Sequence, residues 1–237
     1  MSKIGVHCVI GPRNGFGDFL RKIADAGQTL AVVKCVDDFG AAKEAKDLMP
    51  NTLTVGRLNL FHSTDGEVVD TQGFEPLLPD GKYRDAREVA EWFYAGVKPH
   101  WDRNRDRIDV WETFNEFSWH WPWQADFYSA LMDLAEADDY RLGLWSSSAG
   151  NPPEEFYPDI ARACRRAKAH GGHIVCLHEY NLDGLLKDAP KTMVTRYRRL
   201  YQYLAREDAV IPLVVSEAGE NGGGGFTGVE TFLNDFA

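Results

Sequence analysis

The sequence has few cysteines, and their spacing fits neither a disulfide framework nor a metal site. Four cysteines occur in 237 residues, and no two of them have the C-x-x-C spacing. Cys8, Cys35 and Cys176 lie in apolar, strand-like runs, where a free thiol behaves as a small hydrophobic group. The H-x-H, H-E-x-x-H and D-x-D-x-D-G patterns are also missing. We therefore expect reduced structural cysteines, no metal and no cofactor.

Long apolar runs and an excess of positive charge are missing as well. No run approaches the roughly 18 apolar residues of a membrane span, and no signal-peptide core follows Met1. This predicts no membrane association and a cytoplasmic location for the chain as given, or secretion if an upstream signal has been removed. The net charge of −10, with no stretch dense in Lys and Arg, argues against nucleic acid as a partner.

Apolar strand-like segments and helix-like segments alternate along the chain. This alternation predicts an α/β fold whose strands pair in parallel. A long segment at 61–82 is rich in Gly, Asp, Pro and Thr and is predicted to be a functional loop. We expect residues 1–237 to form one domain. The strand-like segments span residues 4–10, 30–36, 53–58, 108–115, 141–145, 173–177 and 211–215.

Polar residues follow many of these strands, which favours a barrel over an open sheet. A (β/α)8 barrel brings the C-terminal ends of all its strands to one face, whereas a doubly wound sheet concentrates its site at one switch point. The phosphate-binding G-x-G-x-x-G and G-K-[ST] patterns are also absent after the first strand. We predict a (β/α)8 TIM barrel that lacks the last strand–helix unit. The polar residues at strand ends are His7, Asp37, Arg57, Glu116, Ser146, His178 and Glu217.

The apparent lack of an eighth strand leaves an apolar edge between the first strand and the seventh. The segment 229–236 has apolar residues at helical spacing, so we expect a helix there and not a hidden strand. An open edge attracts a partner or a cover. The chain is therefore expected to be part of a longer protein or a homo-oligomer that covers the gap. A monomer would need closure by an element within 61–82 or by direct pairing of strands one and seven.

Two glutamates stand at strand ends. Glu116 ends the run I-D-V-W-E-T-F-N-E, and Glu217 ends the run I-P-L-V-V-S-E. A buried strand gains nothing from an Asn-Glu pair at its tip, because both side chains need polar partners once desolvated. Both could be ordinary strand-end charges. Paired carboxylates on one barrel face instead favour glycoside hydrolysis, in which one is the acid/base and the other the nucleophile or base.

Three motifs resemble the clan A glycoside hydrolases. Trp111–Glu116 is similar to their strand-four W-[DE]-x-x-N-E signature, 214–219 to their strand-seven nucleophile segment, and His178-Glu-Tyr180 to the H-x-Y after strand six. The resemblance implies a retaining O-glycosidase acting on a β-linked glycan, with Glu116 as acid/base and Glu217 as nucleophile. It also implies that Asn115 binds the sugar 2-hydroxyl and that Tyr180 or His178 orients Glu217.

The chain departs from the clan pattern at strand two. Clan members usually carry an arginine near the end of that strand, whereas this chain has Lys34 there and its nearest arginine, Arg57, on strand three. Both are candidate substrate-binding residues. Trp119 begins the run W-H-W-P-W and is expected to stack on a sugar ring, while other tryptophans of the run pack the next helix.

Two other functions remain open at this point. The first is a carbohydrate-binding barrel that has lost catalytic activity, since the strand-eight tryptophan that commonly floors the sugar site has no counterpart. The second is a barrel enzyme that acts on a substrate other than a sugar and uses two glutamates for proton transfer.

Overall fold

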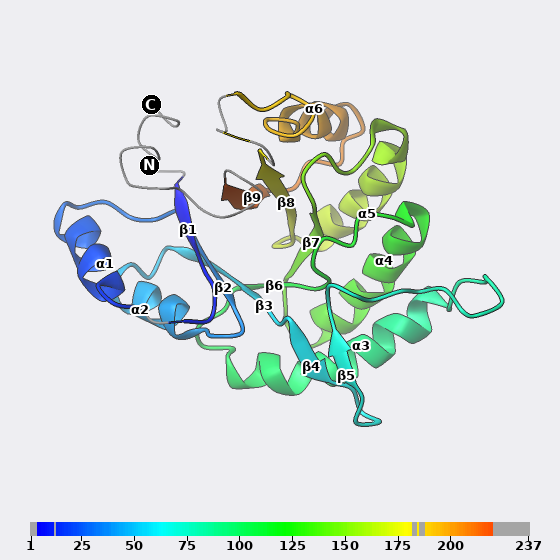
Figure 1. Ribbon diagram of the computed structural model, residues 1–237, viewed down its shortest axis with the longest axis horizontal. Helices are drawn as coiled ribbons and strands as arrows, with labels where there is room; N and C mark the ends of the chain where they lie inside the picture. Colours follow the sequence, from blue (N-terminus) through cyan, green and yellow to red (C-terminus); the bar gives the residue numbers. More distant parts are fainter. Residues whose placement is uncertain (1–3, 12, 182–183, 185–187, 220–237) are drawn as a thin grey trace.

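The computed structural model describes residues 4–11, 13–181, 184 and 188–219. Its centre is a parallel sheet that curves into a nearly closed barrel (Figure 1). Neighbouring strands in space are also neighbours among the strands predicted from the sequence. In spatial order the strands are β1 (Gly5–Cys8), β2 (Val32–Val36), β3 (Leu53–Arg57), β6 (Val110–Glu112), β7 (Leu142–Ser147), β8 (Ile174–Tyr180) and β9 (Leu213–Gly219).

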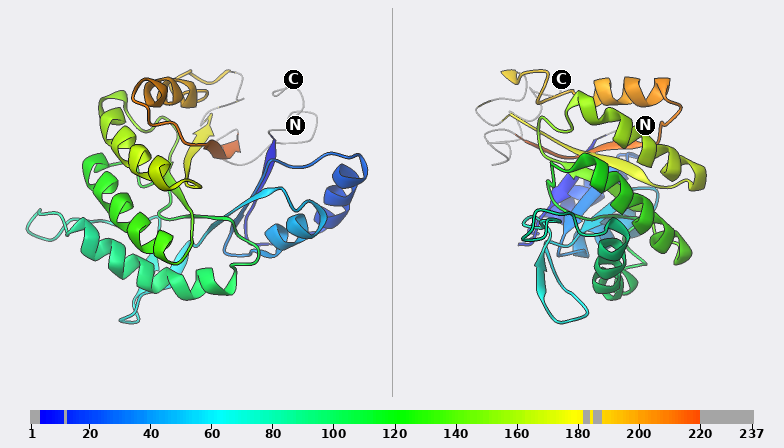
Figure 2. Two further views of the ribbon diagram at one scale, coloured as in Figure 1. Left: turned by 180° about the vertical axis from the view of Figure 1, so that it is seen from behind. Right: turned by 90° about the vertical axis from the view of Figure 1, so that its right-hand side faces the viewer.

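Helices surround the outside of this sheet, as the two views of Figure 2 show. Asp85 is the N-cap of the helix at 86–103, because its carboxylate accepts hydrogen bonds from the backbone N–H groups of Arg87 and Glu88. None of the helices in the described ranges is long and apolar enough to cross a membrane. The helices are α1 (Phe16–Asp25), α2 (Gly40–Leu48), α3 (Ala86–Arg103), α4 (Trp121–Ala137), the 3-10 helix η1 (Glu154–Phe156), α5 (Tyr157–His170) and α6 (Tyr197–Arg206).

The predicted fold class is confirmed, as an α/β fold consistent with an incomplete (β/α)8 barrel. The prediction of a continuous loop at 61–82 is wrong, because β4 (Leu60–His62) and β5 (Val68–Asp70) form an antiparallel hairpin. In each of these three-residue strands only the central residue is buried, namely Phe61 and Val69. A pattern this short is easily lost among turn residues.

Strands β1 and β9 are the two ends of the seven-stranded sheet. Within the described ranges neither pairs with the other, and the β4–β5 hairpin forms its own two-stranded sheet. In this part of the chain, therefore, neither an element of 61–82 nor direct pairing of the first and seventh strands closes the barrel. The helix predicted at 229–236 lies outside the described residues. That a second copy covers the edge stays a prediction.

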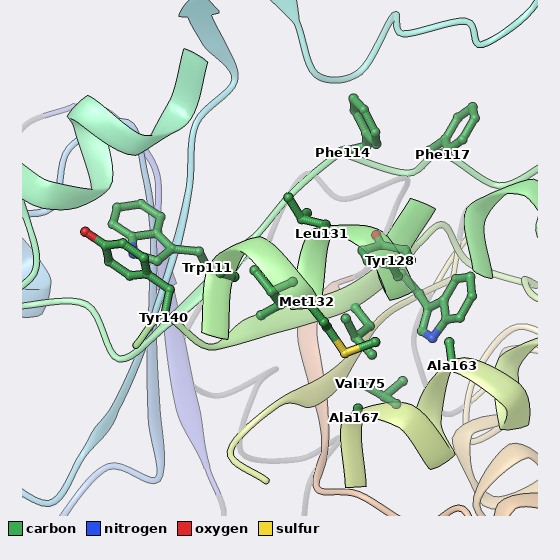
Figure 3. Packing of buried hydrophobic residues seen from close by; sticks show 14 of the residues in the cluster. Trp111, Phe114, Phe117, Tyr128, Leu131, Met132, Tyr140, Ala163, Ala167 and Val175 are labelled. Atoms are coloured by element: carbon green, nitrogen blue, oxygen red, sulfur yellow. The ribbon is translucent and has the colours of Figure 1, made fainter. Parts of the chain in front are cut away.

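Two apolar layers flank the sheet. The larger layer lies between the sheet and the helices, where Trp111 stacks on Trp101 with ring centroids 5.4 Å apart. Gly56 makes this contact possible, since a Cβ at that position would lie 2.7 Å from the Trp111 ring. Figure 3 shows side chains of helix α4, among them Leu131 and Met132, reaching toward the strands. The smaller layer lies inside the barrel and includes Val55, Val110, Ile174 and Cys176.

Candidate active site

A layer of charged and polar side chains lies directly above the apolar layer inside the barrel. Alternate residues of a strand point to the same face, so a residue two positions after an interior apolar residue also points inward. Four site residues follow this rule and stand nearer the C-terminal ends of the strands. The pairs are Val32–Lys34, Val55–Arg57, Val110–Glu112 and Cys176–His178.

Glu217, on β9, is held by three hydrogen bonds. Its Oε1 accepts from Lys34 Nζ at 2.6 Å and from Arg57 Nη1 at 2.8 Å, while its Oε2 accepts from the Tyr180 hydroxyl at 2.6 Å. Burial acts to raise the pKa of Glu217, but the positive field of Lys34 and its neighbours holds that pKa well below the ordinary value. Burial and the adjacent carboxylate raise the pKa of Tyr180, so its hydroxyl remains a donor. Glu217 is therefore an ionised, fixed carboxylate.

Glu116 follows β6 in a strained turn. Its φ is 52°, a left-handed conformation that is uncommon outside glycine and persists where the surroundings impose it. The Glu116 N–H donates to the Ser146 carbonyl at 3.0 Å, and the Asn115 N–H donates to the Thr71 carbonyl at 3.1 Å. Ser146 also has a positive φ, 40°, and the register of β7 against β8 shifts at this point. The register shift of β7 at Ser146 and the backbone of Thr71, just after β5, together hold Glu116 at the strand end.

Aromatic side chains pack against one another on both sides of Glu116 in the sequence. Phe114 stacks on Phe74 with centroids 4.4 Å apart, and Phe117 meets Trp123 edge-on at 6.0 Å. Figure 3 shows Phe114 and Phe117 on the segment that leaves β6. Both are almost completely buried. This packing limits the movement of the Glu116 backbone.

His178 lies between the two glutamates. Its Nδ1 is 2.9 Å from Glu116 Oε1, and its Nε2 is 3.5 Å from Glu217 Oε1 and 3.5 Å from Lys34 Nζ. Burial lowers the pKa of His178, so the ring is neutral near pH 7. Because an ammonium group can only donate, Nε2 is the acceptor toward Lys34, and Nδ1 carries the proton and donates to Glu116. His178 is the register partner of Glu217 in the β8–β9 pair, after a register shift at Leu177.

Glu112 belongs to this site although the sequence reasoning gave it no role. Its Oε2 is 2.7 Å from Lys34 Nζ and 3.7 Å from Arg57 Nη1, and its side chain is 0% exposed. Burial would raise the pKa of Glu112, but Lys34 and Arg57 lower it to about 2. Gly143 on β7 leaves room for it, since a Cβ there would lie 3.0 Å from Glu112 Cγ. A carboxylate inside an apolar strand requires a cation as its partner, so the position of Glu112 in the sequence was itself the signal for a buried ion pair.

The structure brings six of the eight candidate residues into one connected cluster: Glu116, Glu217, His178, Tyr180, Lys34 and Arg57. Lys34 and Arg57 were expected to bind substrate, yet their cationic groups bind carboxylates, and a substrate contact by either stays a prediction. In the described residues no group of three or more His, Cys, Asp and Glu could hold a metal ion.

The two other candidates lie next to this cluster in the chain. Asn115 precedes Glu116, and its buried Oδ1 has no hydrogen-bond partner among the residues that the structure describes. Trp119 is 42% exposed and meets Phe117 edge-on at 5.2 Å. Trp121 and Trp123 of the same run are buried against the core. Their roles toward a ligand remain predictions.

Comparison with known proteins shows the fold. No protein-family model matches the sequence, and no curated protein matches it. The structure is similar to a β-mannanase from Thermomonospora fusca, with a TM-score of 0.52 and 13% identity over 98% of this chain and 74% of that chain. It is similar to the mannotriose complex of a T. fusca β-mannanase, with a TM-score of 0.51 and 13% identity over 92% and 70% of the two chains. An endo-β-1,6-glucanase gives a TM-score of 0.50 and 11% identity over 86% and 56%. The fold thus resembles glycoside hydrolase barrels.

Proposed function

We propose that this chain is a retaining glycoside hydrolase that cleaves a β-linked oligo- or polysaccharide, with Glu116 as acid/base and Glu217 as nucleophile. The contrast between the two carboxylates on either side of His178 carries the proposal. Glu217 is ionised and bound by two cations, whereas Glu116 has 30% of its side chain exposed and contacts a neutral imidazole. Carboxylates in such different environments suit the two roles of nucleophile and acid.

The contacts of Glu217 favour Oε2 as the oxygen that would attack the sugar. Lys34 and Arg57 both bind Oε1, so Oε2, bound by the Tyr180 hydroxyl, is the freer nucleophile. In the first step Oε2 bonds to the anomeric carbon, the glycosidic bond breaks, and the leaving oxygen takes the proton of Glu116. In the second step Glu116 removes a proton from water, and that water's attack at the anomeric carbon frees Glu217.

His178 selects the oxygen of Glu116 that carries the proton. Its Nδ1–H donates to Oε1 of Glu116, and a carboxyl oxygen can accept this hydrogen bond in either protonation state. The transferable proton then resides on Oε2 of Glu116. The imidazole stays neutral through the cycle and acts as an orienting donor.

The substrates to test first are β-linked hexose polysaccharides. The similar structures are a β-mannanase, including one bound to mannotriose, and an endo-β-1,6-glucanase. We therefore propose β-mannan and β-1,6-glucan as initial candidates. The exposed ring of Trp119, three residues after Glu116, would stack on a sugar next to the cleaved bond.

A second candidate function is a carbohydrate-binding barrel with little turnover. It is favoured by the two cations on Oε1 of Glu217, because strong ion pairing lowers the nucleophilicity of a carboxylate. Binding of polysaccharide without hydrolysis by the unaltered chain would support this candidate over the first.

The test compares variants of the two glutamates on a panel of polysaccharides and aryl glycosides. Glu217→Ala should abolish turnover, and azide should restore part of it with inverted stereochemistry. Glu116→Ala should retain far more activity on substrates with good leaving groups, which need little protonation. Glu207→Ala is the matched control, since Glu207 lies on the surface beside Arg165. Equal loss on both substrate types for Glu116→Ala would remove the acid/base role.

A further inference from the structure

We propose that Glu112 is a positioning residue whose negative charge balances Lys34 and Arg57 while Glu217 gains and loses its own charge. This inference rests on the proposed function. Glu112 acts through the two cations and not through contact with substrate, because its side chain is 0% exposed.

Four buried charges form a balanced network at the base of the site. Lys34 Nζ lies between two carboxylates, 2.7 Å from Glu112 Oε2 and 2.6 Å from Glu217 Oε1. Arg57 Nη1 is 2.8 Å from Glu217 Oε1 and 3.7 Å from Glu112 Oε2. No side chain of the four is more than 10% exposed. Two cations are thus shared by two anions away from solvent.

The chemical step disturbs this balance. When Glu217 becomes a glycosyl ester it loses its charge, and Glu116, which gives up its proton in the same step, becomes negative on the other side of His178. The four-charge network itself then holds two cations and one anion. Without the Glu112 carboxylate, the same step would leave two cations and no anion. An uncompensated charge is costly in a buried, low-dielectric environment. Glu112 therefore lowers the free energy of the covalent intermediate.

The two half-reactions respond in opposite directions. Formation of the ester removes a negative charge next to Lys34 and Arg57, so loss of Glu112 opposes it. Hydrolysis of the ester restores that charge, so loss of Glu112 favours it. A residue that only supported the fold would slow both steps or neither.

Glu112→Gln keeps the shape of the side chain and removes its charge. We expect its kcat/KM on an aryl β-glycoside, which reports ester formation, to fall about 10- to 100-fold. The reactivation rate of the intermediate trapped with a 2-deoxy-2-fluoro glycoside should rise above that of the unaltered chain. Adding Lys34→Met removes one cation and restores the balance, so the double variant should recover part of the lost kcat/KM.

Glu179→Gln is the matched control. Glu179 is another buried glutamate, on β8, and its oxygens accept hydrogen bonds from the backbone N–H groups of Thr195 and Tyr197. Glu179→Gln should lower the free energy of unfolding, but it should not change the rates of ester formation and reactivation in opposite directions. If Glu112→Gln alone does not fold, the comparison is made in the Lys34→Met background, where adding Glu112→Gln should again slow ester formation and speed reactivation.

The outcomes separate this inference from the proposed function. An unaltered chain that hydrolyses no glycoside refutes the proposed function, and the role of Glu112 with it. An active chain in which Glu112→Gln slows both half-reactions together, or leaves both unchanged, refutes only the role of Glu112. Failure of Lys34→Met to restore any ester formation in the Glu112→Gln variant also overturns it.

Discussion

Lys34→Met is expected to destabilise the protein strongly, because Lys34 joins two buried carboxylates. Methionine has a similar length and no charge. The substitution leaves Glu112 fully buried with Arg57 at 3.7 Å and removes one of the two cations from Oε1 of Glu217. The structure therefore predicts a buried carboxylate without a close counter-ion.

The size of the expected loss of stability follows from the burial of Lys34 and of its carboxylate partners. Removing one partner of a buried ion pair costs about 3–5 kcal/mol of unfolding free energy. For a chain of this length each kcal/mol corresponds to about 2–4 °C in Tm, so the Tm should fall by roughly 6–20 °C. Lys43→Met is the matched control, since Lys43 pairs with Asp47 on the surface of α2, and it should cost less than about 1 kcal/mol.

The loss of stability should also depend on pH. Lys34 and Arg57 hold the pKa of Glu112 near 2 in the folded protein, against an ordinary value of 4.5. A carboxyl whose folded pKa is lowered contributes stability above its unfolded pKa, and this contribution disappears as the pH falls toward the folded pKa. Lys34→Met lacks that contribution at every pH, so its difference from the unaltered protein should be largest near pH 7 and shrink below about pH 4.5.

Urea unfolding at pH 7 and at pH 3 measures both effects, because the contribution of Glu112 is lost between pH 4.5 and its folded pKa near 2. A difference below about 1 kcal/mol at pH 7 would show that Lys34 is not a structural counter-ion. A large difference that stays constant between the two pH values would show that the cost does not arise from ionised Glu112.

Three further predictions concern other parts of the site and the core. Asn115→Ala should keep the fold and lower kcat/KM by roughly 2–4 kcal/mol of transition-state binding, and a lower Tm with normal specific activity would contradict this role. Trp101→Ala should lower the free energy of unfolding by about 3–5 kcal/mol in urea, because its ring is buried against Trp111. Trp119→Ala should change stability little and raise KM for a polysaccharide, because its ring is exposed. A stable Trp101→Ala and an unstable Trp119→Ala would be inconsistent with this burial. Burial lowers the pKa of His178 below 6.5, so stability should fall as the pH drops from 6.5 toward that lowered pKa, and His178→Gln should flatten this slope.

Much of the fold was predictable because the strands are distinct in the sequence. Parallel strands that are covered on both faces read as apolar runs, and seven such runs appear in the order in which the strands pair. The β4–β5 hairpin was missed because each of its strands has three residues with one buried side chain.

The strand-end position of the two glutamates and the contacts of Tyr180 and His178 were predictable, but the pairing of Lys34 and Arg57 with carboxylates was not. Polar residues at strand ends mark Glu116 and Glu217, and parallel topology places them on one face. The sequence does not show that Lys34 meets Glu112, since this contact depends on which interior side chains lie opposite one another across the barrel. The left-handed turn at Glu116 also has no glycine to signal it.

In the proposed retaining mechanism, Glu217 becomes covalently attached to the sugar. Incubation of the intact chain with 2-deoxy-2-fluoro-β-glycosyl fluorides of the gluco and manno series, followed by peptide mass spectrometry, would detect this adduct. We predict one added glycosyl unit on the peptide that contains Glu217, and no adduct in Glu217→Gln. An adduct on another residue, or polysaccharide hydrolysis with no adduct from either series, would contradict a nucleophilic role of Glu217.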